Sequence, residues 1–100
     1  MQSIPCQAVS EVFDALAHPV RVRIVELLME RELCVCEIVA LLGRRQAYVS
    51  QQLAVLRQAG IVHDRREGLK VFYRLADDRI GELVRRAAAL SGCTDAAAVA

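Results

Sequence analysis

Two cysteines separated by one residue, Cys34 and Cys36 in "ELCVCEIVALLG", are the best candidates for chemistry in this sequence. Residues two apart in a regular helix point about 200° away from each other. The two thiols can therefore meet at one ligand only if Cys34 lies before the helix or in a distorted first turn. The letters "RELC" precede the helical periodicity, which favours that position. A helix N-terminus also lowers the pKa of a nearby thiol, which supplies the thiolate that a metal requires.

A pair of thiolates selects soft ions such as As(III), Sb(III), Cd(II), Pb(II), Cu(I) or Zn(II), and it excludes hard ions. Two ligands are too few for a tight site, so a third ligand must come from elsewhere. The sequence contains two more cysteines, Cys6 and Cys93. A single cysteine is more often a small buried hydrophobic residue than a ligand. The close pair is therefore the stronger candidate, and Cys6 and Cys93 are secondary ones.

The N-terminal sequence and the hydropathy predict a cytoplasmic protein with no membrane partner. No apolar run approaches the roughly 18 residues that span a bilayer, and "MQSIPCQAVSEVF" lacks the pattern of a signal peptide. Thiols stay reduced in the cytoplasm, so cysteines there indicate metal binding or redox chemistry more often than structural disulfides.

The length of 100 residues predicts one domain over residues 1–100, with tails at 1–7 and 94–100. His18 and Pro19 suit the start of a helix, Gly43 suits the end of one, and Asp77 or Asp78 can cap the last. The alternation around Glu67-Gly68 predicts a β-hairpin. This order is that of a winged helix-turn-helix, mainly α with a β-hairpin wing. The expected helices cover residues 8–17, 19–30, 36–43, 46–59 and a stretch that begins after the Asp77/Asp78 cap.

The basic residues of this sequence are concentrated in one segment. The formal net charge is only +1, yet residues 44–74 contain seven basic and two acidic side chains. Such a block is typical of a surface that contacts DNA, although a solvated helix face and a charged hairpin would look similar. A recognition helix reads the major groove through its N-terminal residues, and a wing grips the backbone or the minor groove. The expected DNA contacts are Gln46, Tyr48, Ser50 and Gln51 on the helix and Arg65, Arg66 and Lys70 on the hairpin.

Four segments, "LAHPVRVRIVELL", "ELCVCEIVALLG", "YVSQQLAVLRQAGIV" and "REGLKVFYRL", together resemble the ArsR/SmtB family of metal-sensing repressors over about residues 9–90. The resemblance implies a homodimeric winged helix-turn-helix repressor whose first and last helices form the dimer interface. It implies binding to an imperfect palindrome in double-stranded operator DNA, and release when an inducer binds. The apolar stripe of the last helix, which a monomer of this size would struggle to cover, agrees with a dimer.

Within that family, the thiol pair is similar to the "CVC" box of arsenic sensors and of cadmium/lead sensors. Arsenic sensors add a third cysteine three residues later, where this sequence has Val39; cadmium/lead sensors recruit N-terminal cysteines, and here there is one, Cys6. Three sulfurs from Cys34, Cys36 and Cys6 suit As(III) or Sb(III) and can suit Pb(II). A four-thiolate Cd(II) site would also need Cys93 or an outside ligand. The zinc-sensing arrangement is not met, because "DDRIGELVRRAAAL" contains no histidine.

Two other classes of protein remain as alternatives. The first is a thiol redox switch on the same fold, in which Cys34 or Cys36 forms a disulfide with Cys6 or Cys93 on oxidation. The second is a small enzyme such as an arsenate reductase, which would need an anion-binding loop at a helix start. No "CxxxxxR" and no acid–base group accompany the cysteines, so we expect neither an enzyme nor an organic cofactor. The sequence favours a repressor induced by As(III) or Sb(III), with a Cd(II)/Pb(II) sensor or a redox switch as alternatives.

Overall fold

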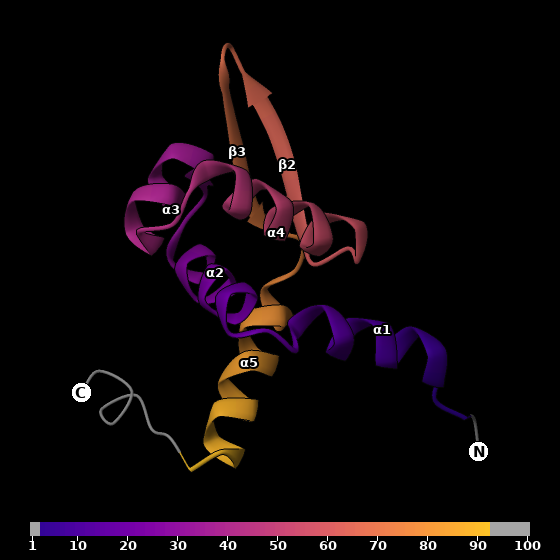
Figure 1. Cartoon of the computed structure of the whole chain (residues 1–100). Helices are drawn as coiled ribbons and strands as arrows, with labels where there is room; N and C mark the ends of the chain where they lie inside the picture. Colours follow the sequence, from indigo (N-terminus) through magenta and orange to yellow (C-terminus); the bar gives the residue numbers. More distant parts are fainter. Residues whose placement is uncertain (1–2, 93–100) are drawn as a thin grey trace.

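Helices make up most of the computed structural model, which describes residues 3–92, and a β-hairpin projects from them (Figure 1). The predicted order of helices and hairpin is confirmed, and the first helix begins two residues earlier than expected. A two-residue strand, which the sequence did not predict, precedes the third helix. The elements are α1 (Cys6–Leu16), α2 (Pro19–Glu30), β1 (Leu33–Cys34), α3 (Val35–Leu42), α4 (Gln46–Gln58), β2 (Val62–Glu67), β3 (Lys70–Leu75) and α5 (Asp78–Leu90).

Local chemistry sets the helix ends at the positions predicted. The Nδ1 atom of His18 accepts a hydrogen bond from the Val20 N–H at 3.2 Å, so His18 is the N-cap of α2. Gly43 follows α3 with a φ of 65°, the left-handed conformation that glycine adopts at no steric cost. The Asp77 carboxylate caps α5 by accepting from the Arg79 N–H at 2.8 Å. The predicted roles of His18, Gly43 and Asp77 are confirmed.

The hydrophobic core lies where α2, α3 and α4 meet the base of the hairpin. The predicted inner face of α4, formed by Val49, Leu53 and Leu56, is fully buried. Burial of such side chains is the main stabilising contribution to the fold. The other buried core residues are Ala15, Ile24, Val25, Leu28, Leu33, Ile38, Ile61, Val62 and Tyr73.

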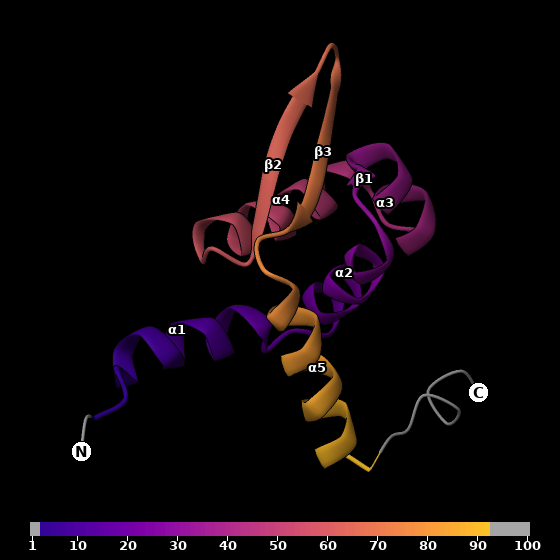
Figure 2. The same cartoon turned by 180° about the vertical axis from the view of Figure 1, so that it is seen from behind.

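The helices α1 and α5 carry apolar surface that a single chain leaves uncovered. Both extend away from the rest of the molecule (Figure 2), and Phe13 on α1 is 55% exposed while Leu90 on α5 is 91% exposed. Packing of α1 and α5 against a second copy would remove these apolar side chains from water. None of the helices within residues 3–92 combines the length and apolar character that crossing a membrane requires.

The three strands form one antiparallel sheet in the order β1–β3–β2. The hairpin of β2 and β3 is the wing, and β1 adds to it through the pairs Leu33↔Tyr73 and Cys34↔Phe72. Since Cys34 is the last residue of β1 and α3 begins at Val35, the base of the wing is joined directly to the start of α3. The thiol segment therefore contacts the wing through the backbone of the sheet.

Candidate thiol site and nucleic-acid interface

Cys34 lies immediately before α3, as convergence of the thiol pair requires. Its backbone is extended, with φ −79° and ψ 160°, and its side chain is 3% exposed. Cys36 lies in the first turn of α3 and is exposed. The structure joins Cys34 and Cys36 by a disulfide, with 5.4 Å between their Cα atoms. When reduced, the same two residues would present two thiols at one point, one from the sheet and one from the helix.

The backbone at the thiol pair is fixed by Glu37. One carboxylate oxygen of Glu37 accepts a hydrogen bond from the Cys34 N–H at 3.0 Å, and the other accepts from Arg31 at 2.9 Å. The bond from the Cys34 backbone, followed by the bond from Arg31, lowers the pKa of Glu37. This arrangement satisfies one of the free N–H groups that precede a helix. It therefore holds the start of α3, and with it the backbone of the thiol pair, in position.

The thiol pair lines a pocket of about 260 Å³ that also includes residues predicted to contact DNA. Gln46 and Ser50 enter it from the first turns of α4, and Lys70 enters it from the wing. A ligand on the two sulfurs would thus lie against both α4 and the wing, the two elements that carry the predicted DNA contacts. The remaining lining residues are Val35, Leu69, Val71 and Tyr73.

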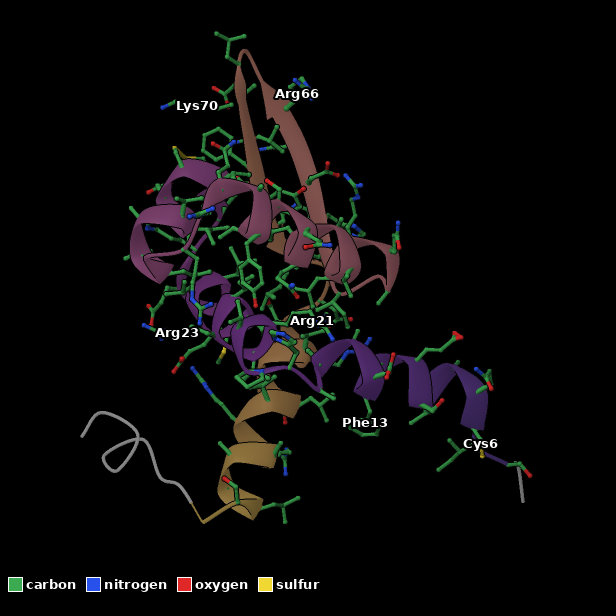
Figure 3. The ribbon with its side chains drawn as sticks, in the orientation of Figure 1. Cys6, Phe13, Arg21, Arg23, Arg66 and Lys70 are labelled. Atoms are coloured by element: carbon green, nitrogen blue, oxygen red, sulfur yellow. A yellow bond between two sulfur atoms is a disulfide. The ribbon has the colours of Figure 1, made fainter. Side chains whose placement is uncertain are left out.

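Cys6 does not approach the thiol pair within one chain. It begins α1, is exposed, and its thiol donates to the Ile4 carbonyl at 3.4 Å. Figure 3 places it at the end of α1 remote from α3. Among residues 3–92, no group of three Cys, His, Asp or Glu side chains is arranged to hold a metal ion. Because Cys6 is remote from the thiol pair of its own chain, it could act as the third ligand only from a second subunit. Cys93, the other candidate ligand, lies outside the described residues.

The disulfide pairing also differs from the redox alternative drawn from the sequence. That alternative paired Cys34 or Cys36 with Cys6 or Cys93, whereas the structure pairs Cys34 with Cys36 and leaves Cys6 as a free thiol. The physical reason is distance. Cys34 and Cys36 lie two residues apart at the start of α3, with 5.4 Å between their Cα atoms, while Cys6 lies at the far end of α1 (Figure 3).

The N-terminal half of α4 presents the polar side chains predicted for a recognition helix. Gln46, Ser50 and Gln51 are exposed, and Tyr48 is half-buried. The Arg44 guanidinium lies 5.4 Å from the centre of the Tyr48 ring, which keeps a positive charge beside the phenol. These groups are of the kind that donate to and accept from base edges and phosphates.

The three cations of the wing that are predicted to contact DNA have two different environments. Arg66 and Lys70 are exposed near the tip (Figure 3), and neither forms an ion pair within residues 3–92. Arg65 differs, because its guanidinium is bound by the carboxylates of Glu32 and Glu67. Arg66 and Lys70 are therefore the wing cations that a phosphate can approach without displacing a carboxylate.

This difference predicts a change in the salt dependence of DNA binding. Each phosphate contact contributes about 0.9 to the slope of log affinity against log salt. If Arg66 contacts a phosphate in each subunit of a dimer, Arg66→Gln should reduce the slope by about 1.8. Fluorescence anisotropy at a series of salt concentrations measures the slope. Arg23→Gln, which removes the same charge from an exposed position on α2, should leave the slope unchanged. Equal effects of the two variants would show that Arg66 does not contact a phosphate.

A buried contact between α2 and α4 was missed by the sequence analysis. Gln52 is 7% exposed, and its Oε1 accepts from Arg21 at 3.0 Å. The same guanidinium donates to the carbonyls of Ala15 at 2.6 Å and Asp14 at 3.4 Å, at the C-terminal end of α1. Arg21 thereby connects the end of α1 to the recognition helix. The signal in the sequence was a glutamine on the inner face of α4, directly before Leu53, where a polar side chain requires a partner.

Loss of this contact should destabilise the fold. Arg21→Met removes the donor to a buried amide, so we expect the free energy of unfolding to fall by about 1–3 kcal/mol. Urea denaturation measures the change. The double variant Arg21→Met/Gln52→Met replaces both partners by apolar groups and should recover much of the loss. Additive losses from the two substitutions would show that the bond between them contributes nothing.

The fold and the exposed face of α4 define a class, the winged helix-turn-helix DNA-binding domains. Similar solved structures include Rv0081 of Mycobacterium tuberculosis, with a TM-score of 0.79, 41% identity and coverage of 90% of this chain and 92% of that chain. They also include the homodimeric winged helix-turn-helix DNA-binding domain of Mb0332 from Mycobacterium bovis, with a TM-score of 0.80, 29% identity and coverage of 92% of this chain and 89% of that chain. The predicted fold class is confirmed.

Residues 18–64 match the family described as bacterial regulatory protein, arsR family. A transcriptional repressor SmtB homolog from Synechocystis is 42% identical over 82% of this chain, which spans 62% of that repressor's length. The chain belongs to the arsR family, as the resemblance implied, and the relatives named here are regulators rather than enzymes.

Proposed function

We propose that this chain is a transcriptional repressor that binds operator DNA as a homodimer and is released when Cys34 and Cys36 bind a thiophilic metalloid, As(III) or Sb(III). The observation that carries the proposal is the pocket shared by both cysteines, by Gln46 and Ser50 of α4, and by Lys70 of the wing. The shared pocket supports a site in which an inducer on the thiol pair lies beside the side chains that we expect to contact DNA.

Dimerisation gives the recognition helices their spacing. Two α4 helices in a dimer read half-sites about one helical turn apart, which makes an imperfect palindrome the expected operator. The exposed apolar residues on α1 and α5, such as Phe13 and Leu90, support a dimer through these helices. The homodimeric relative from Mycobacterium bovis has the same fold.

Binding of the inducer acts on the start of α3. A ligand held by the thiolates of Cys34 and Cys36 adds a constraint between the last residue of β1 and the first turn of α3. It also occupies the pocket against α4 and the wing. We expect this to favour a dimer shape that fits the operator poorly. The effect is a coupling free energy, so bound DNA must weaken inducer binding by the same factor.

The number of sulfur ligands limits which ions the site can bind. Cys34 and Cys36 supply two, and Cys6 from a second subunit would complete the three that suit As(III) or Sb(III) and can suit Pb(II). The alternative to an As(III)- or Sb(III)-responsive repressor is a Cd(II)/Pb(II)-responsive repressor of the same family. A four-thiolate Cd(II) site needs Cys93 or an outside ligand in addition.

Fluorescence anisotropy of the reduced protein on DNA from its own promoter tests the proposal. Arsenite, antimonite, cadmium, lead and zinc are titrated separately. Release by arsenite and antimonite alone supports the metalloid site, and Cys6→Ser then tests the third ligand. Release by cadmium or lead favours the alternative. If no ion releases the DNA, the metal-responsive repressor is excluded.

A second candidate function, a redox switch, is favoured by the disulfide between Cys34 and Cys36. In this reaction the two thiols lose two protons and two electrons to a peroxide, which is reduced to water or an alcohol. Oxidation would then add the constraint between the last residue of β1 and the first turn of α3 that an inducer adds in the metalloid mechanism. A peroxide titration without metal distinguishes the two functions, because only the redox switch releases DNA in it and recovers with a thiol reductant.

A further inference from the structure

An ion pair on the sheet connects the thiol segment to the wing. Glu32, which directly precedes β1, binds the guanidinium of Arg65 on β2 in a bidentate manner. Both Glu32 oxygens accept from Arg65 Nε at 3.0 Å, and Oε1 also accepts from a terminal nitrogen at 2.7 Å. Arg65 donates with its other terminal nitrogen to Glu67 at 2.6 Å. The two partners Glu32 and Arg65 are 33 residues apart in the sequence.

This ion pair passes over the central strand of the sheet. Strand β3 lies between β1 and β2, and its residue Phe72 pairs with Cys34 on one side and with Arg65 on the other. The Arg65 guanidinium stacks over the Phe72 ring, 4.6 Å from its centre. We name Glu32, Phe72 and Arg65 the cross-strand bridge. It holds the outer strand of the wing to the segment that carries Cys34.

The geometry of the bridge distinguishes it from an ordinary surface ion pair, which contributes little. A bidentate arginine–carboxylate pair fixes orientation as well as distance, and stacking on an aromatic ring fixes the guanidinium plane. The bonds from Arg65 lower the pKa of Glu32, and those from Glu32 and Glu67 raise the pKa of Arg65. The Glu32 side chain is 29% exposed. The bridge therefore favours one arrangement of wing and thiol segment.

We infer that the cross-strand bridge is the positioning device through which ligand binding at Cys34 and Cys36 alters the position of the wing, and so its grip on DNA. The inference rests on the proposed function, since it names the path by which the inducer acts. Movement of β1 on ligand binding displaces Glu32, and Glu32 moves β2 through Arg65. The bridge adds to the two-residue pairing of β1 with β3 and to the packing of α3 against β3, and it is the contact that reaches the outer strand β2.

The test is the ratio of the operator Kd with saturating arsenite to the Kd without it. This ratio measures coupling, and general effects of charge on DNA affinity cancel in it. Glu32→Gln keeps the shape of the side chain and removes the ionic bond. Since substitutions along a coupling path alter coupling by about 0.5–2 kcal/mol, the ratio should fall about two- to thirtyfold towards one. Arg65→Lys, which keeps the charge but loses the bidentate geometry, should also lower it.

Glu26→Gln is the matched control. It removes the same charge from an exposed ion pair with Arg23, at 2.6 Å, on α2. The ratio of this variant should equal that of the parent. A bridge with a merely structural role would change both Kd values of Glu32→Gln together and leave the ratio at the parental value, and that result overturns the inference. A parent protein that arsenite does not release overturns the proposed function, and the inference with it.

Discussion

Replacement of both Cys34 and Cys36 by serine should leave the protein bound to its operator at arsenite concentrations that release the parent. The parent Kd should rise about 5- to 150-fold with arsenite, the usual range of allosteric coupling, and the variant Kd should change by less than about twofold. Serine hydroxyls do not bind As(III) as thiolates do. Anisotropy with reduced protein, with and without arsenite, measures both ratios.

The experiment must distinguish a serine variant that has lost the inducer site from one that no longer folds. Cys34 is 3% exposed, so its serine places a hydroxyl in the interior, whereas Cys36 is exposed and tolerates the change more readily. Cys36→Ser alone is therefore the second variant, and it should also lose most of the response. Each variant must bind DNA without arsenite as the parent does. A Cys34→Ser/Cys36→Ser dimer that still left DNA on arsenite addition would refute the assignment of the site.

Leu53→Ala should produce the largest loss of stability among the substitutions considered. Leu53 is fully buried on the inner face of α4, between Val49 and Leu56. Removal of its isopropyl group leaves a cavity beneath α4, so the free energy of unfolding should fall by about 2–5 kcal/mol. Urea denaturation at one fixed protein concentration measures this loss, because the stability of a dimer depends on concentration.

Leu69→Ala is the matched control for that experiment. Leu69 lies in the turn that joins β2 to β3 and is 100% exposed. The same substitution there should change the free energy of unfolding by less than about 0.5 kcal/mol. A loss below about 1 kcal/mol for Leu53→Ala would contradict the packing of α4 described above.

The helices were predictable because their signals are local. The spacing of Val49, Leu53 and Leu56 is a helical repeat, and the structure buries all three. His18 and Gly43 act within a few residues of their positions in the sequence, so their capping roles follow from residue type. The position of Cys34 before α3 follows in the same way from the point where the periodicity begins.

Long-range contacts account for what the sequence did not predict. Strand β1 has only two residues, too few for an alternating pattern, and it exists because β3 lies beside it. The pairing of Arg65 with Glu32 depends on that same strand order, so the sequence predicted Arg65 as a DNA contact without revealing this ion pair. The pocket likewise combines α3, α4 and the wing, which only the tertiary fold brings together.

The most direct test of the thiol pair as an inducer site coupled to DNA is arsenite affinity measured with and without operator DNA. The reduced protein is titrated with arsenite alone, and then in complex with a saturating operator duplex. We expect operator DNA to weaken arsenite binding by the same factor by which arsenite weakens DNA binding. Arsenite binding of equal strength in both titrations would contradict the coupling, and absence of binding to the reduced protein would contradict the site itself.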